Sequence, residues 1–333
     1  MNPANLSSFV PFFRNAHLST IASNFWRRPI SDVLFPVTRR VYRTAPDVQI
    51  GVDEQSPPNP VAHVLGIHGL EGSSHSGYLL SLSHELLNAG YAVHRFNMRS
   101  CGGTEDLATS NYHAGQTSDV LSVLRQIREN WTGPLFLVGF SLGGNVSLKL
   151  AGELGEDAIG FIDGVCSVSN PLDLAACSDA LEEPRNVIYE NRFLKYLRAR
   201  IHRRHLQYPE IYDIRPLAQI RTIRQFDDAY TAKLFGFGTA ANYFATQSSN
   251  QFLELIKVPT LLIQAKDDPL IPFRVYSHPA LQSNPNLRLM ATDHGGHVGF
   301  IAQRQPRFWI DPFIHRWTEE IRNKSARTTV IIP

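Results

Sequence analysis

The pentapeptide at residues 139–143, Gly-Phe-Ser-Leu-Gly, places a serine between two glycines in a setting that favours nucleophilic chemistry. The apolar run at 134–140 is typical of a buried strand, and residues 142–154 have helix-forming sequence. A strand followed at once by a helix puts Ser141 on a sharp, strained turn, where the glycines leave room for closely approaching backbone. We therefore interpret Ser141 as a nucleophile, and a purely structural turn is the alternative.

A serine hydroxyl needs a base before it can attack, and histidines are the candidates. Residues 293–300, Asp-His-Gly-Gly-His-Val-Gly-Phe, hold His294 and His297 among glycines that leave space for an imidazole. We favour His297, because His294 lies nearer the end of the preceding predicted strand. A surface histidine is the alternative interpretation of His297. His68, at the end of the first buried strand, is interpreted as a structural histidine that holds its loop.

The base in turn needs a carboxylate, which fixes its tautomer and stabilises the imidazolium. Residues 265–272, Ala-Lys-Asp-Asp-Pro-Leu-Ile-Pro, follow a later predicted strand and offer Asp267 and Asp268. Adjacent side chains diverge, so we assign the role to one of them, Asp268, with Asp267 as the alternative. Turn formation and capping are the non-catalytic roles open to both.

Attack on a carbonyl group also requires donors for the oxygen that becomes negatively charged. The backbone amide of Leu142, directly after the serine, is the first expected donor. The second is expected in the loop at 68–74, which follows the first buried strand, and we assign it to the amide of Leu70. These two amides would form the oxyanion hole.

Alternating strands and helices must position these residues. Residues 33–53 predict two antiparallel strands around a turn at Pro46-Asp47. Further strands are predicted at 61–69, 91–99, 134–140 and 161–169, and helices at 77–90, 116–131 and 142–154. This alternation predicts an α/β fold with a mostly parallel sheet that is covered by helices on both faces.

The alternation stops between residues 172 and 255, where helical patterns replace strand-like runs. Strands are predicted again at 258–265 and 286–292, followed by a last helix at 307–322. We expect one domain over residues 1–333. Within it, the helical insertion at 172–255 is expected to form a lid over the active site.

Two features of the insertion each allow two interpretations. Its aromatic residues could line an acyl pocket or form the core of the lid: Phe226, Tyr230, Phe235, Phe237, Tyr243 and Phe244. The arginines between the apolar positions of 191–205 are expected to form a solvated face. Weak contact of that face with lipid headgroups or a membrane surface is the alternative.

The two ends of the chain allow simpler predictions. Leu18, Ile21 and Phe25 have helical spacing, which predicts a short amphipathic helix packed on the body of the protein. Residues 1–15 lack the basic segment and long apolar run of a signal peptide. Residues 325–333 are consistent with a loose tail or a partner-binding strand.

The composition excludes several classes of protein. The 333 residues are 43% hydrophobic and 19% charged, as in ordinary globular chains, and a net charge of +2 is too small to indicate nucleic-acid binding. Cys101, Cys166 and Cys177 are an odd number of cysteines without metal-type spacing, which favours a reducing compartment. No apolar run has the length of a membrane span. We expect a soluble cytoplasmic protein that acts on a small-molecule ester with no metal or organic cofactor.

The motifs around Ser141, Asp268 and His297 resemble those of the α/β-hydrolase superfamily. Four further segments resemble its YheT-like branch, which includes yeast medium-chain fatty acid ester synthases and mammalian abhydrolase-domain phospholipases: residues 9–21, 68–78, 97–105 and 224–249. The resemblance implies that these three residues form a charge-relay triad in an α/β-hydrolase fold. Ser100 stands where the branch usually has glycine and Ser19 where it has glutamine, which affects the expected pocket shape only.

The expected function is hydrolysis of short- to medium-chain acyl esters by a carboxylic ester hydrolase, through an acyl-enzyme on Ser141. Transfer of the acyl group to an alcohol is the nearest alternative, because the same triad serves both reactions. A non-catalytic binding module with this fold is the alternative from another class.

Overall fold

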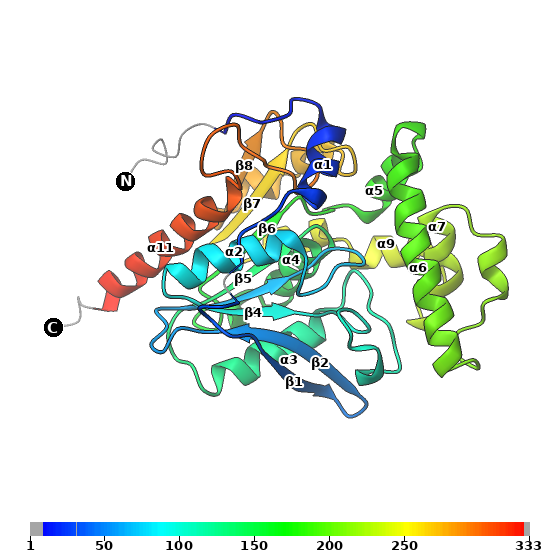
Figure 1. Cartoon of the computed structure of the whole chain (residues 1–333), viewed down its shortest axis with the longest axis horizontal. Coiled ribbons are helices and arrows are strands. Elements are labelled where there is room, and N and C mark those ends of the chain that lie inside the picture. The colour runs from blue at the N-terminus through cyan, green and yellow to red at the C-terminus, as the bar shows by residue number, and fades with distance from the viewer. Residues whose placement is uncertain (1–8, 31, 330–333) are drawn as a thin grey trace.

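The central element of the fold is a mostly parallel sheet, as predicted (Figure 1). The computed structural model describes residues 9–30 and 32–329, and within them the sheet has eight strands in the order β1-β2-β4-β3-β5-β6-β7-β8. β1 pairs antiparallel with β2 and β2 with β4, whereas the other neighbours are parallel. The strands are β1 (Thr38–Ala45), β2 (Val48–Gln55), β3 (His63–Ile67), β4 (Ala92–Phe96), β5 (Leu135–Phe140), β6 (Gly164–Val168), β7 (Thr260–Ala265) and β8 (Leu287–Thr292).

The strand sequences fit a sheet that is buried on both faces. Successive side chains of a strand point to opposite faces. In β5, Leu135 and Leu137 belong to one apolar cluster, and Phe136 and Val138 belong to the other. Both sets are fully buried, which explains why this strand is a continuous apolar run rather than an alternating one.

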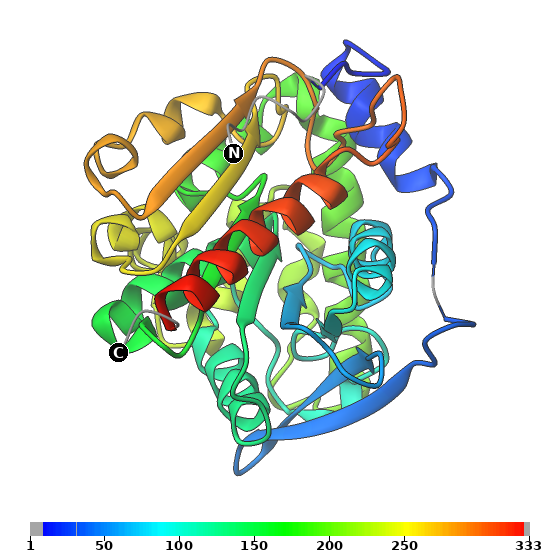
Figure 2. The same ribbon diagram turned by 90° about the vertical axis from the view of Figure 1, so that its left-hand side faces the viewer.

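Helices cover both faces of the sheet, as expected. α2 and α11 contact each other on one face, where Figure 2 shows α11 in red lying across the strands. α3 and α4 contribute to the core on the opposite face. These helices are α2 (Gly77–Asn88), α3 (Thr117–Arg128), α4 (Leu142–Leu154) and α11 (Ile310–Thr329), and the short α10 (Ala280–Ser283) precedes β8.

The chain between β6 and β7 forms a helical insertion, which confirms that part of the prediction. Figure 1 shows α5, α6, α7 and α9 together at one end of the molecule. The bounds are α5 (Leu174–Leu181), α6 (Val187–Gln207), α7 (Ile223–Phe226), α8 (Ala232–Leu234) and α9 (Ala240–Gln247), with a π-helical turn at Asp227–Thr231. Its role as a lid stays a prediction.

The N-terminal helix is present as α1 (Ala16–Phe25), but its apolar stripe faces outward. Phe25 is 77% exposed, and Leu18 and Ile21 are exposed as well. The buried positions are polar: Ser19, Thr20 and Ser23. The predicted helix is therefore confirmed, but it packs on the body with its hydroxyl-bearing face and not with its apolar stripe.

Two arginines of α6 are buried, so the prediction of a solvated arginine face was wrong for them. The Arg204 guanidinium donates hydrogen bonds of 2.7 Å to the carbonyl oxygens of Glu105 and Ala108. These bonds tie α6 to the loop that carries the two carbonyl groups. Arg200 is also buried, whereas Arg192 remains exposed.

The last helix differs from its prediction at both ends. It begins at Ile310 rather than 307, because Phe308 still pairs with Ile301 in an antiparallel bridge. It continues to Thr329, so neither a loose tail nor a strand describes residues 325–329, and 330–333 lie outside the described residues. No helix in the described ranges combines the length and apolarity needed to cross a membrane, and the compartment stays a prediction.

Candidate active site

Ser141 lies on a strained turn between β5 and α4, as its flanking glycines predict. Its φ of 51° is unusual for a residue with a side chain. A Cβ atom on Gly139 would lie 2.2 Å from the carbonyl oxygen of Gly143, and one on Gly143 would lie 2.5 Å from that of His68. Any larger residue at either position would therefore push the turn apart.

A continuous chain of hydrogen bonds joins the three residues favoured from the sequence. Nε2 of His297 lies 2.9 Å from Oγ of Ser141, and Nδ1 of His297 lies 2.9 Å from Oδ2 of Asp268. The Asp268 carboxylate accepts the proton on Nδ1, which leaves the lone pair of Nε2 directed at the serine hydroxyl. The structure thus brings together Ser141, His297 and Asp268 from three separate segments.

The Asp268 side chain is fully buried and held by several donors. Its Oδ1 accepts hydrogen bonds from the backbone amides of Leu270 and Ile271 at 2.9 and 3.1 Å. Its Oδ2 also accepts from Nε2 of Gln264 at 3.2 Å. Together these donors fix the position of the carboxylate opposite the His297 ring.

The neighbouring aspartate and histidine form a separate pair. Oδ2 of Asp267 lies 3.2 Å from Nδ1 of His294, and Oδ1 of Asp267 accepts from the amide of Gly296 at 2.9 Å. Asp267 therefore fastens the loop that carries His297, without a contact to the His297 ring.

His68 is buried at the end of β3 and is held by backbone groups on both sides. Its Nδ1 donates to the carbonyl oxygen of Gly69 at 2.7 Å, and its Nε2 accepts from the amide of Met98 at 3.1 Å. Burial lowers its pKa to about 4, so the ring is neutral near pH 7. These contacts fit the interpretation of His68 as a residue that holds its loop.

Two residues that the sequence did not single out hold the His297 loop. Oγ1 of Thr20, on α1, accepts from the amide of His297 at 2.8 Å. Oγ of Ser169 accepts from the amide of Val298 at 3.1 Å. Both contacts span more than a hundred residues of chain, so no local sequence signal could have revealed them.

The loop that carries Leu70 passes close to Ser141, and Leu142 directly follows the serine in the chain. A Cβ on Gly69 would lie 3.0 Å from the Cβ of Ser141, which shows how closely the loop passes the serine. The amides flanking Leu70 are already used, since Gly69 donates to the Tyr78 hydroxyl and Glu71 to the Tyr112 hydroxyl. Within the described part of the chain, no acceptor is bonded to the amide of Leu70 or Leu142.

A buried ion pair connects this loop to the insertion. Nε of Arg200, on α6, donates to Oε1 of Glu71 at 2.9 Å, and both side chains are only 6% exposed. Tyr112 donates to the same carboxylate at 3.0 Å. Glu71 itself has a φ of 55°, so the contacts hold the residue after Leu70 in a left-handed conformation.

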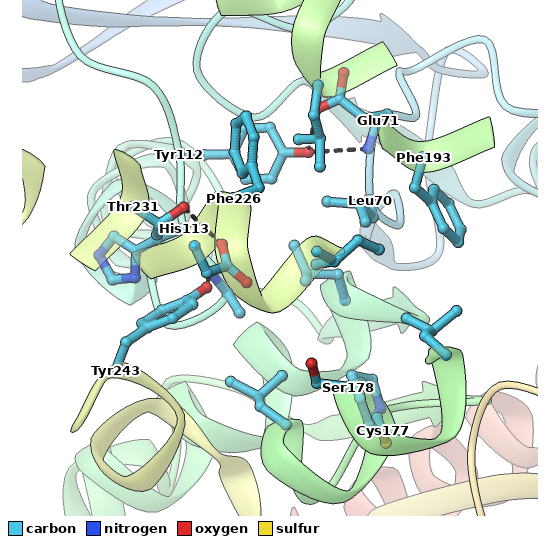
Figure 3. A pocket seen from close by; sticks show the side chains of 18 of the residues that line it. Leu70, Glu71, Tyr112, His113, Cys177, Ser178, Phe193, Phe226, Thr231 and Tyr243 are labelled. Atoms are coloured by element: carbon cyan, nitrogen blue, oxygen red, sulfur yellow. Dashed lines mark hydrogen bonds between the residues drawn. The ribbon is translucent and has the colours of Figure 1, made fainter. Parts of the chain in front are cut away.

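Ser141 and His297 open onto a cavity that lies beneath the insertion (Figure 3). The aromatic residues that line it are Phe226, Tyr230, Phe235, Tyr243 and Phe244, together with Tyr112 and Phe193. Phe237 is not among them and packs against Tyr243. Several of these rings also belong to the buried clusters of the insertion, so the interpretation as core residues is confirmed for them. The interpretation of the cavity as an acyl pocket stays a prediction.

A second, larger groove, which is open to solvent, reaches Ser141 and His297 from the side of α1. Its lining combines α1, the first half of α6 and the loop at 69–72. Large apolar side chains in it are exposed: Ile21, Phe25, Ile30, Ile188 and Tyr196. The serine therefore lies between a mostly apolar cavity and a groove with an apolar rim.

Comparisons with known proteins agree with this fold. Residues 62–302 match the family model described as alpha/beta hydrolase fold. The chain is 33% identical over 323 residues to "Putative esterase YheT" of Escherichia coli, with 93% of each chain covered. It is 30% identical to mouse phospholipase ABHD3 over 73% of this chain, but spans only 59% of that protein. The Pyrococcus furiosus esterase Pf2001 matches in fold, with a TM-score of 0.55, 18% identity and coverage of 90% of this chain and 98% of that one.

Proposed function

The chain belongs to the α/β-hydrolase family, in its YheT-like branch, and on that premise we propose that it hydrolyses carboxylic esters. The observation that carries the proposal is the hydrogen-bonded chain from Asp268 through His297 to Ser141. A nucleophile bonded to a base, and a base oriented by a carboxylate, are the parts that acyl transfer requires.

The proposed reaction proceeds in two halves. Oγ of Ser141 attacks the ester carbonyl while Nε2 of His297 accepts the hydroxyl proton, and the amides of Leu70 and Leu142 stabilise the oxyanion. Collapse of the tetrahedral intermediate breaks the ester bond, and His297 returns the proton to the leaving alcohol. A water molecule, deprotonated by His297, then attacks the acyl-enzyme to form a second tetrahedral intermediate. Its collapse breaks the bond to Oγ of Ser141, His297 returns the proton to this oxygen, and the acid is released. Asp268 holds the His297 tautomer in both halves.

The cavity and the groove that meet at Ser141 suggest where each part of the ester binds. We assign the aromatic-lined cavity to the acyl chain and the open groove to the alcohol part and to water. The apolar lining supports acyl esters of short to medium length over peptides. In this proposal residues 172–255 act as the lid, with Arg200 connecting it to the oxyanion loop through Glu71.

Transfer of the acyl group to an alcohol is the second candidate, since the groove that admits water also has apolar walls. The acyl-enzyme is common to both reactions, and only its partition between water and alcohol differs. The complete triad argues against a non-catalytic binding module.

The test combines a fluorophosphonate probe with a product assay. We expect the purified protein to be labelled at Ser141, as mapped by mass spectrometry, and to release free acid from p-nitrophenyl esters. Added ethanol should change the products only if the acyl-transfer candidate is correct, by converting part of the acid to ethyl ester. No labelling together with no turnover of any ester would refute the hydrolase proposal.

We further propose that the apolar rim of the groove contacts a lipid surface, which would bring lipid esters to Ser141. Phe25 and Ile188, on α1 and α6, are 77% and 66% exposed at this rim, beside the exposed Arg192. Replacing both by glutamate should weaken binding to phosphatidylcholine–phosphatidylglycerol vesicles by roughly tenfold or more in a sedimentation assay, because two apolar anchors are lost. Ile159, exposed beyond the far end of α4, provides the control, and equal losses on its replacement by glutamate would contradict the proposal.

A further inference from the structure

The cavity beneath the insertion contains a cluster of polar groups in its otherwise mostly apolar wall. Figure 3 shows Thr231, His113 and Tyr243 together on one side, away from Leu70 and Phe193. Asp227 joins them, and its Oδ1 accepts a hydrogen bond of 2.7 Å from Oγ1 of Thr231. We call these four residues, Asp227, Thr231, His113 and Tyr243, the polar cluster.

Asp227 has few hydrogen-bond partners for a carboxyl group that lines a mostly apolar cavity. Thr231 is its one hydrogen-bond partner among the described residues, and its Oδ2 has none. Burial raises the pKa of Asp227 to about 7. It lies on the π-helical turn at Asp227–Thr231, a rare conformation that is frequent at functional sites. Asp227 is half-buried in the wall of the cavity, so a ligand that fills the cavity would displace water from this carboxyl group. Such a ligand must supply a hydrogen bond in place of the water, because removing a polar group from water without a partner costs free energy.

Tyr243 and His113 add hydrogen-bond donors to this acceptor. The hydroxyl oxygen of Tyr243 accepts from the amide of Ala114 at 2.8 Å, which leaves the hydroxyl proton for another partner. Nδ1 of His113 accepts from the amide of Gly115 at 3.1 Å. Burial lowers the pKa of His113 to about 3, so its ring is neutral and carries its proton on Nε2. The polar cluster therefore offers both acceptors and donors.

We propose that the polar cluster binds a hydroxyl group on the acyl chain, so that the protein prefers esters of hydroxylated fatty acids. A hydroxyl group both donates and accepts, which matches the mixed character of the cluster. An ammonium group could use Asp227 but would leave the Tyr243 and His113 donors without an acceptor. A plain alkyl chain would leave all of them unpaired. This inference rests on the proposed ester hydrolysis and specifies its substrate class.

The experiment compares p-nitrophenyl esters of unbranched fatty acids of increasing length, each with and without a hydroxyl group on the last carbon. At the length that reaches the polar cluster, the hydroxylated ester should have a kcat/KM higher by about tenfold or more. An apolar pocket without this cluster would prefer the plain ester, because burying the hydroxyl group in it reduces the free energy gained from apolar contact. Asp227→Leu should reverse the preference, and Asp227→Asn should retain most of it.

Asp228→Asn is the matched control on the same turn. Asp228 accepts from the amide of Ala240 at 2.9 Å, and asparagine can keep this bond. The hydroxyl preference should survive in this variant. A wild-type protein that hydrolyses plain esters equally well or better at every length would overturn the inference, as would a hydroxyl preference that survives Asp227→Leu.

A separate binding measurement distinguishes failure of the inference from failure of the proposed function. If no ester is hydrolysed, the proposed function fails. Thermal shifts of the Ser141→Ala variant with matched methyl esters then decide on the cluster. A larger rise in Tm with the hydroxylated ester supports the binding site, and equal or smaller rises refute it.

Discussion

Replacing Ser141 by alanine is expected to lower kcat/KM for esters by about 10⁴-fold or more and to abolish labelling by a fluorophosphonate. The serine supplies the only bond to the acyl group in the proposed reaction. Its removal leaves the amides of Leu70 and Leu142 and the base His297, which can at most assist a direct attack by water. The rate of hydrolysis of a p-nitrophenyl ester measures the first effect, and gel-based detection of the fluorophosphonate label measures the second.

The control for this variant is Ser118→Ala, at an exposed position near the start of α3. It should retain both activity and labelling. Equal labelling of the wild type and Ser141→Ala would mean that another serine reacts with the probe. Comparable esterase activity in the two proteins would contradict the assignment of Ser141 as the nucleophile.

The parts of the fold that could be predicted are those set by local sequence. A strand that is buried on both faces must be apolar throughout, so β5 could be recognised from its sequence. The glycines around Ser141 indicated a tight turn. Gly139 and Gly143 both face backbone atoms at short distance, so a larger residue would not fit at either position. The candidate triad could be located for the same reason, since its motifs follow directly after strands.

The parts that could not be predicted depend on contacts between distant segments. The apolar spacing of α1 indicated a buried stripe, but the Thr20 hydroxyl on the opposite face binds the loop of His297. The arginines of α6 looked like a solvated face, yet Arg200 and Arg204 satisfy buried groups about a hundred residues earlier in the chain. In each case the partner is a backbone or carboxylate group whose position is defined only by the folded chain.

Replacing Asp268 by asparagine is expected to lower kcat by about 10³-fold or more, by analogy with other residues that orient a catalytic histidine. Oδ1 of Asp268 faces the amides of Leu270 and Ile271, so the carbonyl oxygen of an asparagine would occupy that position. Its NH₂ group would then face Nδ1 of His297. A donor opposite Nδ1 forces the imidazole proton onto Nε2, the nitrogen that faces Ser141. Nε2 then cannot accept the proton of the serine hydroxyl.

The adjacent Asp267→Asn change is the matched control, because it alters the same group one residue away. An asparagine there can accept from Gly296 through its oxygen and donate to His294 through its nitrogen. We therefore expect kcat to fall by less than about tenfold. Unfolding curves of both variants would separate catalytic loss from loss of folding. A large effect at Asp267 with a small one at Asp268 would assign the orienting role to Asp267, because of these two residues only the one that fixes the His297 tautomer should lower turnover strongly while the fold is kept.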